Sequence, residues 1–380
     1  MKISQTNLNR IPEMDALRGF ALFGILLVNV FVFHAPYSYY GEFYGAMEGI
    51  QGLTLNIVLA TSAGKFMFIF SFLFGYGIQL QRNSRSSNFN MYFALRMLLL
   101  LLFGALHILF FWVGDILASY ALLGLLIIPF LKLSKKLLLS LGIFFIFFRP
   151  IYYLGMILLD FPSVEGIKAA SFEDFVSTFQ QGTYREILKL RMLEFAAFMP
   201  ENVVWYIPKS FGLFFVGIYA AQSSFFQVLR TKRKAFGITS TILILISLSW
   251  GFLKFDFFQS FDLEQEPHWR PILIAMNVLF ETLQGFAYIF GFSILFQHRN
   301  WLSDLFAKAG RLALSNYILQ SLLCVLIFYG FGLGLYIQLQ VTDLVLIAMV
   351  IYIVNLIFSH LYFKKWSTGP LEYLWKSKLK

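Results

Sequence analysis

The sequence predicts an all-α polytopic membrane protein, a bundle of about ten transmembrane helices with both termini in the cytoplasm. Three observations predict this fold. Hydrophobic residues occupy 59% of the 380 positions and charged residues only 13%, which leaves too few polar side chains to cover the surface of a soluble protein. Long apolar stretches recur along the chain, and the loops between them alternate between basic and acidic.

Each expected span is an apolar stretch long enough to cross the hydrocarbon core, for which a helix needs about 20 residues. The spans are expected near residues 15–34, 56–80, 92–113, 115–131, 137–158, 203–225, 235–255, 271–297, 310–331 and 341–363. In the second of them, residues 56–63 could instead lie along the membrane interface. Together they form a single transmembrane domain over residues 1–380.

The charges of the loops predict the orientation. Segments on one side carry most of the basic residues, among them Arg10, Arg18, Arg82, Arg96, Lys135, Arg233, Arg311 and Lys364. Segments on the other side carry most of the acids, for example Glu42, Glu48, Glu173, Glu264 and Glu266. Because basic loops stay in the cytoplasm, both termini are expected there.

Two extramembrane segments have an amphipathic pattern. In residues 159–202, on the outer side, apolar residues recur at helical spacing among charges, which is typical of short interfacial helices. This segment is either a lid that packs on the bundle or the entrance to an outward-facing site. Residues 364–380 mix Trp, Tyr, Leu and Lys, so this cytoplasmic tail is expected on the inner headgroup layer.

Composition also bears on cofactors, partners and targeting. Cys324 is the single cysteine, which excludes an intramolecular disulfide, and no Cys/His cluster indicates a metal. The net charge of +10 is placed to contact the anionic headgroups of membrane lipids rather than nucleic acid. The first ten residues are polar and no cleavable signal pattern follows them. The oligomeric state is not predicted.

Polar residues within spans are costly and therefore candidates for function. In the first span, Asp15 and Arg18 are neighbours one turn apart, and Asn29 returns to within about 20° of the same face roughly 16 Å further along. Gly19 permits another helix to approach closely. These residues either line a site or make a snorkelling helix start and an interhelical hydrogen bond. His34 points about 160° away from Arg18 and is expected at the interface.

The third span places Arg96 and His107 eleven residues apart, on one face, and Asp115 follows in a short loop. A histidine beside a carboxylate can act as a general base with its orienting partner. The alternative is a core histidine bonded to a backbone carbonyl, with Asp115 as a helix N-cap.

Two further spans carry polar groups. Asn316 and Gln320 lie at i and i+4, where interhelical hydrogen bonding is the commoner role and substrate binding the alternative. Asn277, Glu281 and Gln284 share a face of the eighth span. Glu281, near mid-bilayer, is expected to pair with a cation such as Lys65, to be protonated, or to face a water-filled cavity.

Five segments resemble signatures of the YeiB family of bacterial multi-pass membrane proteins. They are "MDALRGFALFGILLVN", "KFMFIFSFLFGYG", the run "HILFFWVGDILASYALLG" from His107, "GRLALSNYILQS" with "FYGFGLGL", and the closing "WSTGPLEYLW" from Trp366. The resemblance covers nearly the whole chain. It implies a bacterial cytoplasmic (inner or plasma) membrane location.

That family is in turn distantly similar to transmembrane acyltransferases of the heparan-glucosaminide acetyltransferase type. The similarity rests on a D-x-x-R-G start to the first helix and a polar residue fourteen positions after the Asp, here Asp15 and Asn29. It implies transfer of an acyl group from a cytoplasmic acyl-CoA to a small-molecule, lipid or glycan acceptor outside. The loop histidine of those enzymes has no clear counterpart other than His34 or His107.

On this hypothesis Arg18, Arg96 and Arg311 attract the CoA phosphates. His107, oriented by Asp115, acts as the general base, and Asn29 stabilises the developing oxyanion. The alternative is a transporter or permease whose binding site surrounds Glu281, Asn277, Gln284 and Lys65. The chain shows no convincing internal repeat, which many transporters have.

Overall fold

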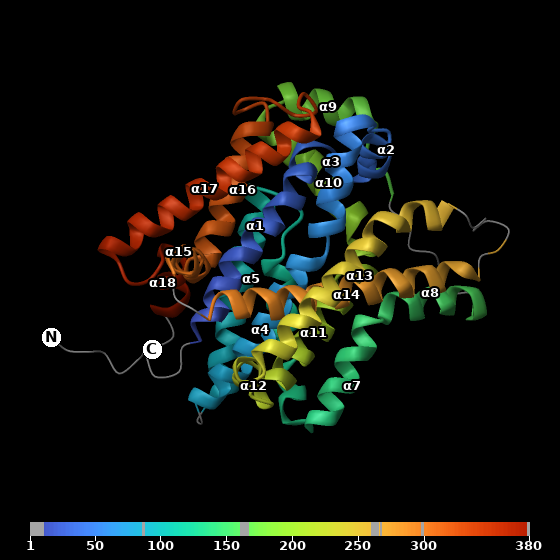
Figure 1. Ribbon diagram of the computed structural model, residues 1–380. Coiled ribbons are helices and arrows are strands. Elements are labelled where there is room, and N and C mark those ends of the chain that lie inside the picture. The colour runs from blue at the N-terminus through green and yellow to red at the C-terminus, as the bar shows by residue number, and fades with distance from the viewer. Residues whose placement is uncertain are drawn as a thin grey trace.

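Helices make up nearly all of the part of the chain that the structure describes, as the sequence predicts (Figure 1). The computed structural model describes residues 11–85, 88–159, 167–259, 266, 268–297 and 300–377. Within these ranges the regular structure is entirely helical. The elements in chain order are α1 (Pro12–His34), η2 (Tyr37–Tyr39), α2 (Tyr40–Gly45), α3 (Gly49–Ser62), α4 (Lys65–Ser84), α5 (Phe89–Phe110), α6 (Leu117–Leu126), η3 (Ile128–Lys132), α7 (Lys135–Ile146), α8 (Phe148–Leu159), α9 (Phe172–Gln181), α10 (Tyr184–Trp205), α11 (Ile207–Gln222), α12 (Phe225–Thr231), α13 (Arg233–Gln259), α14 (Trp269–Leu295), α15 (Trp301–Arg311), α16 (Ala313–Phe328), α17 (Val341–Lys365) and α18 (Pro370–Ser377).

Among the described residues, six helical stretches are long and apolar enough to cross a membrane, and three bent pairs bring the number to nine. The six are α1, α3 with α4, α5, α13, α14 and α17. The bent pairs are α7–α8 at 60°, α10–α11 at 44° and α15–α16 at 82°. The expected span 115–131 is instead the ten-residue α6 followed by η3. The predicted helical bundle is therefore confirmed, whereas several spans that we expected to be continuous are broken.

The bends in two of these pairs lie beside prolines. Pro208 stands in the first turn of α11 and Pro150 in the first turn of α8. Proline lacks a backbone N–H and clashes with the preceding turn, so the ladder of the preceding helix cannot run on through it. The α15–α16 bend has no proline and is held by side chains described below.

Segments that we expected on one side of the membrane lie together. At the basic end, Arg230 forms two 2.7 Å hydrogen bonds with the carboxylate of Glu13, and Lys135 donates to the carbonyl of Gln222 at 2.6 Å. At the other end, Gln180 donates to the carbonyl of Tyr336 at 2.7 Å. Figure 1 shows α12 at the bottom of the view and α9 with α2 at the top. The arrangement separates the basic set of loops from the other set, and the cytoplasmic location of the basic set stays a prediction.

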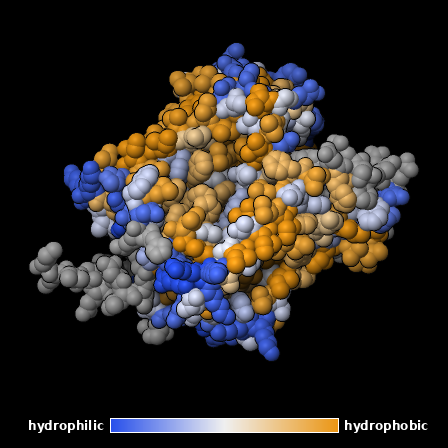
Figure 2. Space-filling model, viewed as in Figure 1, coloured by the Kyte–Doolittle hydropathy of each residue, from blue (hydrophilic) through white to orange (hydrophobic). Residues whose placement is uncertain are grey.

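The surface between these ends is apolar. Figure 2 shows hydrophobic residues over α17, α13 and α14, between hydrophilic residues gathered at the top and the bottom of the view. Exposed apolar residues follow helical spacing on two helices: Leu95, Leu98, Leu102, Leu106 and Leu109 on α5, and Leu346, Val350, Ile353, Ile357 and Leu361 on α17. A soluble protein rarely exposes such continuous stripes. The surface is that of a membrane protein with lipid-facing helices.

Helix α1 is central and packs backbone to backbone on α15. A Cβ added to Gly19 would lie 2.0 Å from the carbonyl oxygen of Phe306, and one added to Gly310 would lie 1.8 Å from that of Asp15. Only hydrogen fits in either place. The close approach expected at Gly19 is therefore confirmed, and it fixes the height and rotation of α1 in the bundle.

We expect Gly310→Ala to lower the free energy of unfolding by about 2–3 kcal/mol, because the new methyl group meets backbone that cannot yield. Thermal unfolding of the detergent-solubilised protein measures the effect. Gly237→Ala in α13 is the matched control, since its nearest neighbour is the Ile294 side chain at an ordinary 3.8 Å. Equal melting temperatures for the two variants would contradict the tight α1–α15 contact.

Candidate functional site

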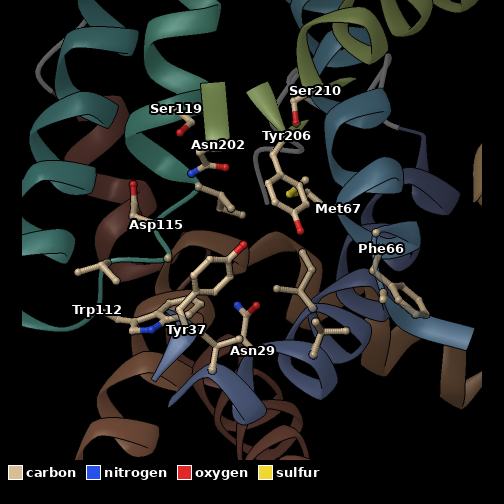
Figure 3. A pocket seen from close by; sticks show the side chains of 18 of the residues that line it. Asn29, Tyr37, Phe66, Met67, Trp112, Asp115, Ser119, Asn202, Tyr206 and Ser210 are labelled. Atoms are coloured by element: carbon tan, nitrogen blue, oxygen red, sulfur yellow. The ribbon is translucent and has the colours of Figure 1, made fainter. Parts of the chain in front are cut away.

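A cavity of about 210 Å³ lies among α1, the α3–α4 break, the α5–α6 loop, α6, α10 and α11. We call it the outer cavity, because its lining includes segments expected outside. Its walls are mostly apolar, with polar side chains from Asn29, Tyr37, Ser119, Asn202, Tyr206 and Ser210 (Figure 3). Such a mainly apolar pocket with a few convergent polar groups is the usual form of a small-molecule site.

Asn29 contributes an unpaired amide to this cavity. It lies on α1, and no hydrogen bond joins its side chain to another described residue. Figure 3 shows the amide below the phenol groups of Tyr37 and Tyr206, which point toward one another. Because an amide carries two donors and an acceptor, it can hold a ligand carbonyl, hydroxyl or amine there.

Tyr37 is fixed by its backbone. Its N–H donates to the carboxylate of Glu194 on α10 at 2.8 Å. Burial raises the pKa of Tyr37 far above its ordinary value, so the phenol remains a neutral donor at physiological pH. The loop after α1 and helix α10 are thereby joined over the cavity.

The break between α3 and α4 forms another wall. Gly64 has a φ of +76°, a left-handed conformation that favours glycine. The carbonyls at the end of α3 lose their helical donors there and are bonded by side chains instead: Leu59 by Lys65 at 2.9 Å, Ala60 by Gln284 at 3.0 Å and Thr61 by Tyr288 at 2.9 Å. The structure thus places Lys65 on a backbone carbonyl.

Glu281 pairs with Lys209 of α11, with Oε2 and Nζ 2.7 Å apart, and its other oxygen accepts from Asn277 at 3.0 Å. The expectation that a cation holds this carboxylate is met, but the partner is not Lys65. Lys209 falls within the expected span 203–225. A lysine there is costly to bury in hydrocarbon, so its position in the sequence already marks it as a candidate partner for a buried carboxylate. Gly64 separates the pair from the outer cavity, because a Cβ there would lie 3.2 Å from Glu281 Oε2.

His107 and Asp115 are brought together as expected, with Nδ1 and Oδ1 2.9 Å apart and both side chains fully buried. Asp115 Oδ2 also accepts from the N–H of Ala118 at 2.6 Å, so the residue caps the start of α6 as well. His107 Nε2 lies 2.8 Å from the hydroxyl of Ser321, a residue that sequence reasoning did not single out. Asp115 belongs to the cavity wall with its carboxylate turned away from Asn29 (Figure 3), whereas His107 is not among the lining residues.

The α5–α6 loop that carries Asp115 is held by side chains of two other helices. Arg191 of α10 donates to the carbonyls of Leu109, at 2.7 Å, and Phe111. The Tyr317 hydroxyl of α16 lies 3.5 Å from the carbonyl of Gly114. These contacts bond backbone carbonyls that have no helical partner, so the loop has a defined conformation in the wall of the outer cavity.

A second cavity, of about 290 Å³, lies at the basic end, and we call it the inner cavity. Its charged lining residues are Asp15, Arg18, Arg96, Arg311 and Glu372. Arg18 Nη1 lies 3.2 Å from Asp15 Oδ1. The stripe expected on α1 is therefore divided, with Asp15 and Arg18 in the inner cavity and Asn29 in the outer one. Phosphates are the groups that such arginines could hold.

The two cavities meet inside the bundle. Ile25, Ile116 and Tyr120 line both of them. The Tyr120 hydroxyl lies 2.6 Å from that of Ser71, which holds the ring in place. One residue layer thus separates the inner cavity, which is lined by several charged side chains, from the mainly apolar outer cavity.

Asn316 and Gln320 line neither cavity. Asn316 donates to the carbonyl of Ala309 at 3.0 Å and to the hydroxyl of Ser359 at 2.8 Å, which joins α15, α16 and α17 at the α15–α16 bend. This is the interhelical role that its spacing favours. Gln320 is buried beside it, and its Nε2 has no partner among the described residues.

His34, which we expected at the membrane interface, is fully buried within the protein at the end of α1. Its Nδ1 lies 2.8 Å from the Tyr44 hydroxyl, and Nε2 accepts from the N–H of Leu339 at 3.2 Å. The loop before α17 folds over the end of α1, which helical periodicity does not reveal. Among the described side chains, no group of three His, Cys, Asp or Glu residues could hold a metal ion.

Comparisons with known proteins match nearly the whole chain. A family described as a protein of unknown function (DUF418) matches residues 220–379. The chain is 28% identical to the uncharacterized protein YxaH of Bacillus subtilis (strain 168), over 97% of this chain and 94% of that protein. It is 26% identical to the uncharacterized protein YeiB of Escherichia coli (strain K12), over 97% and 96%. An uncharacterized 39.9 kDa protein in the amylase 3′ region of Bacillus acidopullulyticus is 29% identical, over 97% and 93%. No solved structure matches.

The Lys209–Glu281 pair predicts coupled stability. Lys209→Met and Glu281→Gln should each lower the free energy of unfolding by about 3–5 kcal/mol, because each leaves a buried charge without its partner. The double variant should lose less than the sum, as thermal unfolding in detergent can measure. Lys189→Met on the exposed face of α10 is the control. Strictly additive losses would show that the two side chains do not interact.

Proposed function

We propose that this chain, which belongs to the YeiB family, transfers an acyl group from a cytoplasmic acyl-CoA to an acceptor on the outer side of the bacterial cytoplasmic membrane. One observation carries the proposal: two cavities reach toward each other from opposite ends of the bundle and share Ile25, Ile116 and Tyr120 as walls. The acyl group then has only a thin layer of side chains to pass.

The inner cavity suits the donor. Arg18, Arg96 and Arg311 belong to its lining, and guanidinium groups bind phosphates with paired N–H donors. The remaining walls are largely apolar and aromatic, with residues such as Phe70, Phe74 and Phe93. These surfaces can accept the acyl chain while the phosphates stay at the mouth.

The outer cavity suits a neutral acceptor. The acceptor oxygen or nitrogen attacks the thioester carbonyl, a C–O or C–N bond forms and the C–S bond breaks. The proton of the acceptor passes through a base to the departing CoA sulfur. The unpaired amide of Asn29 can donate to the oxyanion that develops on the carbonyl oxygen. Phe66 and Met67, in the first turn of α4, lie in the same wall, where the helix dipole also favours negative charge.

His107 remains the proposed base, oriented by Asp115. Its Nε2 faces Ser321 and not the outer cavity, so this role requires movement of the loop at residues 111–116 during the reaction. A transporter with its site around Glu281 is the second candidate. Cavities that approach one another from opposite ends would also serve alternating access.

Donor binding gives the first prediction of this function. Calorimetry on the purified protein should show saturable binding of acetyl-CoA and of a long-chain acyl-CoA, weakened about 10- to 100-fold by Arg18→Ala, because a charge-assisted phosphate contact is lost. Arg185→Ala on the outer end of α10 is the control and should bind as the wild type does. No binding of either ligand would overturn the donor assignment. Gradient-driven flux into vesicles that Glu281→Gln abolishes would then favour transport.

Catalysis gives a second prediction. Asn29→Ala should lower kcat about 10²- to 10³-fold through loss of an oxyanion donor, and His107→Ala about 10²- to 10⁴-fold through loss of the base. Release of free CoA thiol in the presence of outer-leaflet acceptors measures the rate. The melting temperature of each variant shows whether the fold is kept. A fully active double variant would contradict both roles.

A further inference from the structure

The C-terminal helix α18 is docked on the bundle, although its composition predicts only a tail on the headgroup layer. The indole N–H of Trp375 donates to the carbonyl of Arg96 on α5 at 2.9 Å. The carboxylate of Glu372 accepts from the backbone N–H of Ser315 at 3.1 Å and from its hydroxyl at 2.6 Å. Figure 1 shows α18 below α15 at the basic end. These bonds join α18 to both α5 and α16.

Helix α18 is also a wall of the inner cavity. Glu372 and Trp375 line it together with the three arginines of the proposed donor site. The two carboxylates of the lining are engaged, Asp15 by Arg18 and Glu372 by Ser315. Three guanidinium groups and two carboxylates therefore line this space, and one of the guanidinium groups, that of Arg18, is itself the partner of Asp15.

A neighbouring hollow of about 630 Å³ extends this site at the same end. Gln81 lines both spaces, and the hollow adds Arg85 and Arg230 to the basic groups. Arg230 is held by Glu13, while Arg85 lies over the ring of Tyr92 at 3.7 Å. A ligand with several phosphates and a bulky head thus finds room and positive charge beyond the inner cavity itself.

Trp375 presents an oriented aromatic surface inside this basic setting. The guanidinium of Arg96 lies over one face of its ring, 4.1 Å from the centre, which leaves the opposite face for a base, and the bond from its N–H to the Arg96 carbonyl fixes the ring plane. The residue remains partly exposed in the lining. An aromatic ring beside arginines is the combination that holds nucleotides, because bases stack on such rings while guanidinium groups bind the phosphates.

We infer that α18 completes a nucleotide-binding site at the inner cavity, in which the base of the ligand stacks on Trp375 and its phosphates meet Arg18, Arg96 and Arg311. The inference rests on the proposed function for the identity of the ligand, since CoA carries an adenine nucleotide. It adds a base-recognition surface supplied by the C-terminal motif. A phosphate-bearing lipid headgroup would use the arginines but has no base to stack.

Calorimetry on the full-length protein tests the inference with two probes. Adenosine 3′,5′-bisphosphate carries the base, whereas pyrophosphate carries only negative charge. The wild type should bind the bisphosphate about 10-fold more tightly than pyrophosphate. Trp375→Ala should remove about that factor for the bisphosphate and leave pyrophosphate unchanged. Trp375→Phe should stay within about threefold of the wild type because it keeps a ring to stack on.

Trp366→Ala is the matched control, since Trp366 is half exposed, stacks on Tyr362 at 4.7 Å and does not line the cavity. Equal loss of both probes in Trp375→Ala would mean that the ring only holds α18 in place, which overturns the inference. Unchanged bisphosphate binding in that variant, or a wild type that does not distinguish the probes, would overturn it as well. Acyl transfer by the wild type alongside any of these results leaves the proposed function standing. If bisphosphate binding depends on Trp375 but the wild type transfers no acyl group, the nucleotide-binding site stands and the proposed function does not.

Discussion

Backbone groups that helices leave open inside a membrane must find partners, and this constraint shapes the whole bundle. At the α3–α4 break, three carbonyls are bonded by Lys65, Gln284 and Tyr288. At the α15–α16 bend, Asn316 bonds the carbonyl of Ala309. At the α5–α6 loop, Arg191 bonds two more. The polar side chains within the membrane thus stabilise the helix breaks, because they bond the backbone carbonyls that lack a helical partner.

Irregular backbone is in turn what creates the cavities. A bundle of straight helices packed along their full length leaves little internal space. Here the outer cavity lies where α4 starts at Gly64 and where the chain turns between α5 and α6. The inner cavity lies where α15 bends into α16 beside Gly310 and where α18 returns to the bundle. The polar residues that stabilise the helix breaks therefore also make possible the cavities that the candidate functional residues line.

The sequence indicates which helix faces carry the polar residues but not which residues of other helices contact them. Apolar length and loop charge indicated the helical bundle and its two ends, and the spacing of Asp15, Arg18 and Asn29 placed them on one side of α1. Periodicity within one helix cannot show which helix lies opposite. For that reason Lys209 was missed as the partner of Glu281, and Ser321 as that of His107. The bends and the docking of α18 depend on contacts between distant segments, which a single sequence does not display.

The distribution of charge along α1 fits the transfer of an acyl group better than the passage of a whole ionic substrate. Its inner part presents Asp15 and Arg18, whereas the outer cavity receives the neutral amide of Asn29. Between them the shared walls are Ile25, Ile116 and Tyr120, which offer an ion little to replace its hydration shell. An acyl carbonyl is neutral and small, so its passage needs only a modest movement of side chains. The charged nucleotide of the proposed acyl-CoA donor would then remain at the basic end throughout.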